Sequence, residues 1–394
     1  MRSMATKSAA RRQAAGSGRD IQIPLPPSGL FSDAKDAEIS GMYAAKLENF
    51  RTGGTLLELR RALVFSGSDV SAKQRYPYEF AGHSYLIALR ADRASANGIE
   101  HPRAFAGDAM AAYISSTAVI VDGTAAPLLY NGAAFSDGAF TTSTSVTQNE
   151  FDGVVAHHDR LYFWKSGGAL EFYHGALDRL GNITGQILTM MSLTIDAGSN
   201  TNDVLCIITT TGHAVVYSGL DPSDPTDWSL VTRVKMAPPM SRFAATHVGS
   251  DVWVITSAGI VSVAQSISQG ALALVNEVSR PIAREVLRLI NAGPASWQLH
   301  TAADGSHIIV NRWDGVDASQ FIFEVESKSW TTATYPAAFW HNLGVTTSFT
   351  STSGFLAMLV DNTTSEPPED FGFALSYEAV WHTSWFTIRR GTRI

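Results

Sequence analysis

Short apolar segments alternate with glycine-containing turns along most of the chain. Turns such as Thr211-Gly212 and Ala258-Gly259 are typical of β-hairpins, because glycine adopts a positive φ without steric cost. The paired apolar segments are residues 118–121 with 128–130, 161–164 with 170–173, 205–208 with 214–217, 252–255 with 260–263, 308–311 with 321–325, and 356–359 with 373–377. The pattern predicts a succession of β-hairpins.

The spacing of these hairpins is nearly regular. Their first strands begin at residues 118, 161, 205, 252, 308 and 356, which gives steps of 43, 44, 47, 56 and 48 residues. The second strands of the first three pairs end in Tyr-x-Gly, at Tyr130, Tyr173 and Tyr217. A period in the mid-forties with several strands per unit is typical of a β-propeller, whose four-stranded blades need about that length.

We therefore predict an all-β fold, a β-propeller of six to eight blades with the three tyrosines in equivalent places. A further unit is expected from residues 62–65 and 85–89. Closure of the ring by strands from both ends of the chain would remove its last open edge. A β-sandwich or two tandem β-domains are the alternatives.

Residues 280–291 are expected to form a short inserted helix. Ser279 can cap it and Pro281 suits its first turn, while Gly293 and Pro294 end it. Its apolar stripe packs either on its own propeller or on a neighbouring subunit. The second option makes Ile282, Val286 and Leu289 candidate assembly contacts.

Both ends of the chain are basic. The first 19 residues contain no acid and five basic residues: Arg2, Lys7, Arg11, Arg12 and Arg19. Three arginines and no acid occur in the last six residues, so the formal net charge of −7 leaves about −15 on the body. An acidic body argues against a general nucleic-acid binder.

We expect residues 1–30 to extend from the propeller and to pack on another polypeptide, which makes these five basic residues candidate assembly contacts. A disordered tail and a mitochondrial-type presequence are the alternatives. The expected organisation is a basic and proline-rich arm (1–30), an N-terminal segment with the first propeller strands (31–110), the blades (111–385) and a basic C-terminal tail (386–394).

The single cysteine excludes an intrachain disulfide, and the absence of an apolar run of 18 residues predicts no membrane span.

Candidate catalytic and metal-binding residues are few. His157 and His158 are adjacent, and because neighbouring residues of a strand point to opposite faces we expect their rings not to converge. Cys206 lies in an apolar run and is expected in the core, and the carboxylates Glu366, Glu369 and Asp370 are expected in a solvated loop. We predict no catalytic residues, no metal site and no cofactor.

The loop 221–228, DPSDPTDW, contains three aspartates and two prolines. It differs from the aspartate box of sialidase propellers, since prolines stand where that box needs glycine. We expect a rigid turn in which aspartate side chains bind backbone donors and Trp228 packs between blades.

The order of several motifs resembles the β-propeller hub, or nozzle, proteins of short-tailed bacteriophages. In residues 217–267 the motifs are the loop 221–228, a proline turn at 238–242 (PPMSR) and a hairpin at 248–260 (VGSDVWVITSAGI). Earlier segments that resemble the family are residues 151–175, 127–135 and 45–61, although Arg61-Ala62 departs from the usual glycine. The resemblance covers roughly residues 45–270.

The resemblance implies a structural virion protein without catalytic residues, located in the phage tail and assembled in the host cytoplasm. It implies a ring, with six copies as the expected number, below the portal and adaptor proteins and beside a tail fibre, needle or other tail proteins. The ring would surround double-stranded DNA without reading its sequence and would help to retain the packaged genome. The alternatives are a propeller glycoside hydrolase and a carbohydrate-binding propeller with stacking platforms at Trp313, Trp330, Trp340, Trp381 and Trp385.

Overall fold

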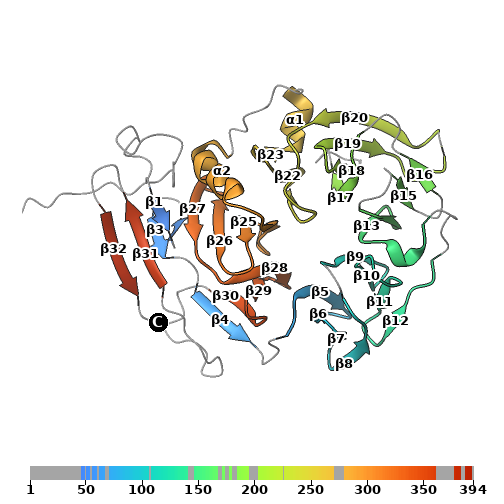
Figure 1. Ribbon diagram of the computed structural model, residues 1–394, viewed down its shortest axis with the longest axis horizontal. Coiled ribbons are helices and arrows are strands. Elements are labelled where there is room, and N and C mark those ends of the chain that lie inside the picture. The colour runs from blue at the N-terminus through green and yellow to red at the C-terminus, as the bar shows by residue number, and fades with distance from the viewer. Residues whose placement is uncertain are drawn as a thin grey trace, which may run out of the picture.

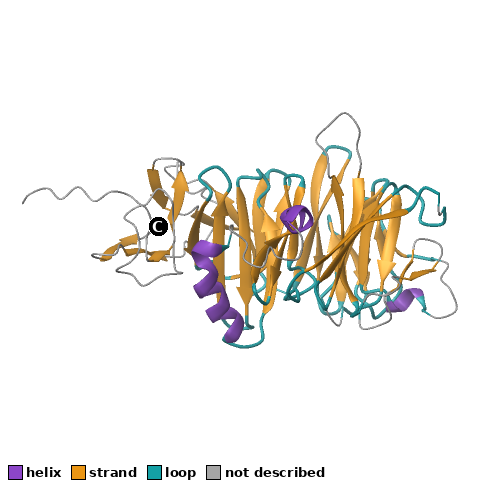
Figure 2. Ribbon diagram, turned by 90° about the horizontal axis from the view of Figure 1, so that it is seen from above, coloured by secondary structure: helices purple, strands orange, loops and turns teal. Residues whose placement is uncertain are grey.

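Seven antiparallel β-sheets stand in a ring around a common axis, which makes the chain a β-propeller (Figure 1). Six of its blades have four strands and one has three. Figure 2 shows the ring from the side, with the strands running between its two faces. The computed structural model describes residues 46–48, 50–53, 56–59, 62–66, 71–105, 108–140, 146–166, 171–173, 177–179, 184–194, 203–224, 226–269, 279–360, 377–382 and 387–392.

The first four blades follow one another along the chain, each as a meander from an inner to an outer strand. Blade 1 is β5 (Gln74–Phe80), β6 (His83–Leu89), β7 (Arg93–Ala96) and β8 (Ile99–Pro102). Blade 2 is β9 (Met110–Ile114), β10 (Thr117–Val121), β11 (Leu128–Tyr130) and β12 (Phe135–Asp137). Blade 3 is β13 (Gly153–His157), β14 (Arg160–Trp164), β15 (Glu171–Tyr173) and β16 (Leu177–Arg179), and it follows the 3₁₀ turn η2 (Gln148–Glu150). Blade 4 is β17 (Ile187–Thr194), β18 (Asp203–Thr209), β19 (His213–Ser218) and β20 (Ser229–Lys235).

Two of the remaining blades differ from the first four: blade 5 has only three strands, and blade 7 takes its fourth strand from the other end of the chain. Blade 5 has three strands, β21 (Ala245–Val248), β22 (Asp251–Thr256) and β23 (Gly259–Ser262), and helix α1 (Val263–Gln269) follows β23 directly. Blade 6 is β24 (Ser296–Thr301), β25 (His307–Trp313), β26 (Ala318–Glu324) and β27 (Ser329–Ala333). Blade 7 is β28 (Ala337–Leu343), β29 (Thr346–Ser351), β30 (Leu356–Val360) and, from the other end of the chain, β4 (Ala62–Ser66).

The ring closes by pairing β4 antiparallel to β30, with Phe65 opposite Ala357. This confirms the expected closure by strands from both ends of the chain. It also corrects the sixth predicted hairpin, because residues 356–359 lie in the third strand of blade 7 and pair with β29 and β4. Residues 85–89 lie in blade 1 and not beside β4, and residues 373–376 lie outside the described residues.

An outer sheet extends blade 6 away from the axis. Strand β1 (Lys46–Glu48) pairs parallel to β27, β31 (Tyr377–His382) pairs with β1, and β32 (Thr387–Thr392) pairs with β31. A hairpin of β2 (Phe50–Gly53) and β3 (Leu56–Leu59) follows β1, and β2 contacts β27. The expected C-terminal tail at 386–394 therefore contains a strand, and residues 377–382 belong to this outer sheet and not to a blade.

Tyr130, Tyr173 and Tyr217 all lie in the third strand of their blades, β11, β15 and β19. Each is at or next to the end of its strand, opposite the second strand of the same blade. The repeat that predicted a propeller therefore corresponds to consecutive blades 2, 3 and 4.

Apolar side chains from neighbouring blades form the core between the sheets. The largest cluster joins blades 5 and 6, with Trp253 on one side and Trp297, Phe321 and Trp330 on the other. Trp330 and Trp340 are each 1% exposed, so neither can serve as a stacking platform for a sugar. Burial of both faces of every blade against its neighbours is what makes the ring stable.

The inserted helix packs on its own propeller. It consists of the 3₁₀ turn η4 (Arg280–Ile282) and α2 (Ala283–Asn291), and Ile282, Val286 and Leu289 join the core cluster of blades 5 and 6. These side chains are at most 8% exposed and do not offer a surface to a second subunit, which corrects their assignment as assembly contacts. The Ser279 hydroxyl makes no cap hydrogen bond and donates to the carbonyl of Ile260 at 3.2 Å, so the predicted cap is wrong.

Gly153 is required by the packing of blade 3. It lies opposite Trp164, whose side chain is fully buried. A Cβ at position 153 would lie 1.8 Å from Cε2 of Trp164. The indole therefore occupies the space that any other residue at this position would fill.

We expect Gly153→Ala to lower the free energy of unfolding by about 1–3 kcal/mol, because the indole must move from its packed position. Urea unfolding followed by tryptophan fluorescence measures the change. In a double-mutant cycle, Trp164→Phe should remove part of the cost of the alanine. A Gly153→Ala variant as stable as the parent would contradict the packing argument.

Candidate functional site

The segment Pro238–Phe243 lies between the last strand of blade 4 and the first strand of blade 5. Two backbone hydrogen bonds attach it to blade 5, Met240 N to Ile255 O at 3.1 Å and Ser257 N to Pro238 O at 2.8 Å, and a third, Ile255 N to Ala244 O at 2.7 Å, holds the residue that follows it. Its two consecutive prolines have no N–H groups and restrict φ. The segment is thus a rigid turn fixed to its own blade, and we call it the axial segment.

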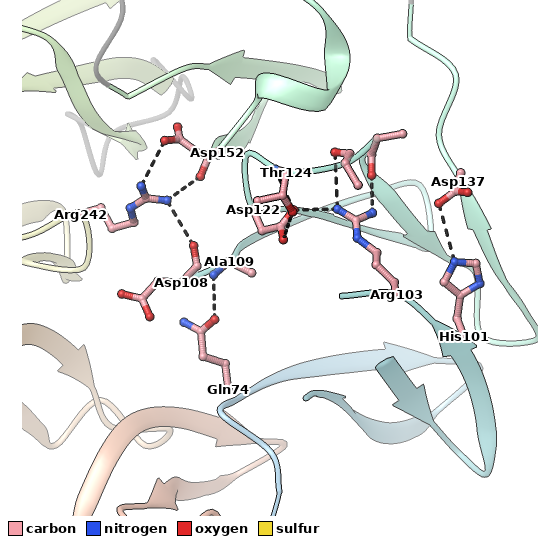
Figure 3. Close-up of polar contacts among 12 residues, drawn as sticks. Gln74, His101, Arg103, Asp108, Ala109, Asp122, Thr124, Asp137, Asp152 and Arg242 are labelled. Carbon is pink, nitrogen blue, oxygen red and sulfur yellow. Dashed lines mark hydrogen bonds and ion pairs between the residues drawn. The ribbon is translucent and has the colours of Figure 1, made fainter. Parts of the chain in front are cut away.

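Arg242 reaches from the axial segment to blades 2 and 3 (Figure 3). One terminal nitrogen, Nη1, donates to the Asp152 carbonyl at 2.8 Å and to the Asp108 carbonyl at 3.3 Å. The other, Nη2, lies 3.2 Å from the Asp152 carboxylate. Asp108 and Asp152 precede the inner strands β9 and β13, so a single guanidinium joins the starts of two blades to blade 5.

Phe243 makes the corresponding contacts on the other side. Its carbonyl accepts a hydrogen bond from Leu299 N of blade 6 at 2.9 Å. Its ring packs edge to face against Phe339 of blade 7, with centroids 5.2 Å apart. Phe339 in turn contacts the ring of Tyr76 in blade 1 at 5.8 Å. Ser241 adds a hydrogen bond to the Trp297 carbonyl of blade 6.

Blades 1 and 2 are joined at the same level. The Gln74 side-chain oxygen accepts from Ala109 N at 2.8 Å (Figure 3). The Tyr76 hydroxyl donates to the Ala109 carbonyl at 2.5 Å. Burial raises the pKa of Tyr76 well above its usual value, so this hydroxyl stays protonated.

Contacts between blades that are not neighbours in the ring can form only at its centre. Arg242 connects blade 5 with blades 2 and 3, and Phe243 connects blade 5 with blade 7. The axial segment therefore fills the axis of the propeller at the level where the inner strands begin. Arg242 donates to the Asp152 carboxylate, the Asp152 carbonyl and the Asp108 carbonyl. Its guanidinium therefore has a structural role, which is to hold these blades together.

The histidine pair lies at the opposite end of β13 from Asp152, in the interface of blades 3 and 4. His157 ends β13, and His158 lies in the following turn with a positive φ of 45°. The two rings are in contact, with centroids 4.2 Å apart, so the expectation that strand alternation separates them is wrong. His157 Nδ1 lies 2.8 Å from the Ser192 hydroxyl, and His158 Nε2 lies 3.2 Å from the Asp203 carbonyl, both in blade 4.

The histidine pair is part of the packing between blades 3 and 4, and His157 is neutral at physiological pH. Burial, with a smaller effect from His158, lowers the pKa of His157 to about 4. Within the described ranges, no three or more His, Cys, Asp or Glu side chains are grouped so that they could hold a metal ion. Cys206 is fully buried, and burial raises its pKa to about 12, which leaves the thiol protonated and unreactive.

The loop 221–228 has the predicted character of a rigid turn. Asp227 accepts from the backbone N–H of Leu220 and of Asp221, at 2.5 and 3.0 Å. Trp228 stacks on Tyr217 of blade 4 at 5.3 Å and on Tyr162 of blade 3 at 6.3 Å. The expected packing of Trp228 between blades is confirmed.

Other predicted site residues lie outside the described residues. They are the arm residues Arg2, Lys7, Arg11, Arg12 and Arg19, and the loop carboxylates Glu366, Glu369 and Asp370. The axial residues Arg242, Asp152 and Asp108 were not predicted as a site. The proline turn 238–242 was noticed only as a motif of the family resemblance, and an aspartate just before an inner strand was the further signal available.

No protein-family model matches the sequence, and no curated protein is similar to it. Several solved structures are similar in fold. The N-terminal part of BBS1 in complex with ARL6 is 11% identical, with a TM-score of 0.48 over 78% of this chain and 100% of that chain. YCF48 from Cyanidioschyzon merolae is 12% identical, with a TM-score of 0.41 over 76% and 98% of the two chains. The WD40 β-propeller domain of Doa1 is 10% identical, with a TM-score of 0.44 over 77% and 98%.

We expect Arg242→Met to lower the free energy of unfolding by about 2 kcal/mol or more, because Asp152 keeps a half-buried carboxylate without its cation. Chemical denaturation at neutral pH measures the loss. Arg288→Met is the matched control, since its pair with Glu285 is on the helix surface and should contribute less than about 1 kcal/mol. Equal losses in the two variants would contradict a special role for the axial arginine.

The interface between blades 7 and 1 contains buried polar groups beside the Tyr76–Phe339 contact. Arg75 donates to the Thr350 hydroxyl at 3.1 Å and to the Gly354 carbonyl at 2.8 Å. His341 is 3% exposed, and both of its ring nitrogens are buried. Burial, then the charge of Arg75 and then His300, lower the pKa of His341 to about 3.

Acid should therefore destabilise the ring at this interface. The folded-state pKa of about 3 lies below the unfolded value of roughly 6.5, so the unfolded chain binds the proton first. The stability due to the neutral imidazole is complete above about pH 6.5 and falls by up to about 1.4 kcal/mol per pH unit as the pH decreases toward 3. His341→Gln should reduce this slope by one proton between pH 6 and 4, measured by urea unfolding. His83→Gln, at an exposed histidine, is the control, and an unchanged slope in His341→Gln would contradict the assignment.

Proposed function

We propose that this chain is a structural virion protein of a bacteriophage tail. Several copies, six by the family resemblance, form a hub or nozzle ring below the portal and adaptor proteins. The ring surrounds the DNA channel, contacts a tail fibre, needle or other tail proteins, and helps to retain the packaged genome. The observation that carries the proposal is that the proline turn of the resemblance, residues 238–242, is the segment that fills the propeller axis.

The filled axis supports a specific route for the DNA. Since Arg242 and Phe243 occupy the centre of each propeller, a duplex would pass between copies arranged in a ring and not through one propeller. The body of the chain carries about −15 charges, which disfavours tight binding of phosphates. Such a channel lets DNA slide during ejection.

The outer sheet gives this proposal an attachment side. Strand β1 pairs with β31 and β31 with β32, so the first strand and the last two strands that the structure describes lie in one sheet at one edge of the ring (Figure 1). The arm 1–30 precedes this sheet and the last arginine follows it. The basic ends are thus connected to one side of an acidic propeller, where they are suited to bind a neighbouring protein.

We expect the purified full-length protein to form a ring with a mass of about six times the chain mass of 42.3 kDa, measured by light scattering. Removal of residues 2–19 should leave the thermal unfolding of the propeller unchanged and reduce the assembled mass, because the arm makes contacts between chains. A monomer at every concentration would contradict the proposal. Saturable binding or cleavage of an oligosaccharide by that monomer would favour the glycoside hydrolase or carbohydrate-binding alternative.

A further inference from the structure

Among the described residues, the outer strand of blade 4, β20, is the longest outer strand of the propeller, and its outer edge pairs with no other strand. It has seven residues, whereas the outer strands of blades 1, 2, 3, 5 and 7 have three to five. In blade 6 the outer strand β27 is covered by β1. Short length and a covering strand are two protections of a sheet edge, and β20 has neither, although helix α1 contacts the strand.

The exposed side chains of this edge are apolar at one end. Leu230 is 54% exposed and Val231 is 49% exposed, and Leu220 beside them is 58% exposed. Val231 is the extra residue of a bulge, since Leu230 pairs with Tyr217 and Thr232 with Val216. In the part of the chain that the structure describes, the hydrogen bonds of β20 run to β19 and none leaves from its outer side. An exposed apolar edge of this length is a site for addition of a strand.

The chain contains a segment whose pattern suits that position. Residues 21–26 read Ile-Gln-Ile-Pro-Leu-Pro. In an extended strand, successive residues direct their N–H and C=O groups to opposite edges, so Ile21, Ile23 and Leu25 would present complete backbone groups on one edge. Pro24 and Pro26 fall on the other edge, where a missing N–H prevents a further strand from pairing. Such a segment can add to one strand edge and end the sheet there.

The geometry of the ring favours pairing between copies. Strands β1 and β20 lie on opposite sides of the propeller (Figure 1). A neighbour placed beside the outer sheet brings its blade 4 close to β1, which the arm precedes in the chain. A contact of one side with the opposite side of the next copy is head-to-tail, and it gives a ring when the rotation between successive copies closes.

We propose that residues 21–25 of one copy pair with β20 of the next copy as an added strand. The inference rests on the proposed ring and specifies the contact that holds it together. The same kind of extension occurs within the chain, where β1 covers the outer edge of blade 6. Leu220, Leu230 and Val231 then pack against the isoleucine and leucine side chains of the arm.

Cysteine cross-linking of the full-length protein tests this pairing. The native Cys206 is fully buried and does not compete. Ile23→Cys combined with Val231→Cys should give disulfide-linked dimers and higher multiples on a non-reducing gel. Ile23→Cys combined with Val316→Cys is the control, because Val316 is 81% exposed on a hairpin of blade 6. The mass of the same samples under reducing conditions reports separately whether a ring forms.

Cross-linking at position 231 that exceeds the control at least tenfold supports the proposal. A cross-link within one chain, or equal cross-linking at 231 and 316, overturns it even if the protein forms a ring. As a second variant, Ile23→Asp with Leu25→Asp should increase the dissociation constant of assembly at least tenfold while the thermal unfolding of the propeller stays unchanged. Unchanged assembly of this variant also overturns the proposal.

Discussion

Pairing of β4 with β30 joins residues 62–66 to residues 356–360 and so closes the ring with strands from both ends of the chain. Without it, blade 7 would have three strands and the outer edge of β30 would be open, although β28 would still contact β5 of blade 1. The entropy cost of bringing two such distant segments together grows only slowly with the length of the loop between them. The pairing is therefore accessible once every blade has a partner to pack against, and it removes an edge that would otherwise remain open.

The axial segment supplies a second kind of connection. Neighbouring blades are held by apolar packing, but the axial contacts join blades that are not neighbours in the ring, from blade 5 to blades 2, 3 and 7. An arginine suits this task because its planar group presents several donors in different directions at once. The result is a propeller whose centre is held by directional hydrogen bonds and whose circumference is held by non-directional packing.

The sequence predicted the propeller because hairpins with glycine turns repeat where blades 2, 3 and 4 are regular. It misplaced the sixth hairpin because residues 356–359 are apolar in the third strand of blade 7 as well, and apolar alternation does not distinguish a second strand from a third. The outer sheet was missed because β1 lies near the start of the chain and its partners β27 and β31 lie near the end. Nothing local in the sequence indicates these pairings. The histidine pair was misjudged because His158 lies in a turn, where the alternation of a strand no longer applies.

The axial site was predictable only in part. The proline turn at 238–242 was visible as a motif, but the partners Asp108 and Asp152 come from two other blades, and nothing local in the sequence links them to Arg242.

The closure of the ring also has a consequence for the order in which the strands are synthesised. Strand β4 emerges about 290 residues before β30, which at roughly 5–20 residues per second corresponds to about 15–60 s on the ribosome. During that time its apolar sequence Ala-Leu-Val-Phe-Ser has no partner strand, so the chain must complete every blade before its earliest propeller strand can enter the sheet where it belongs.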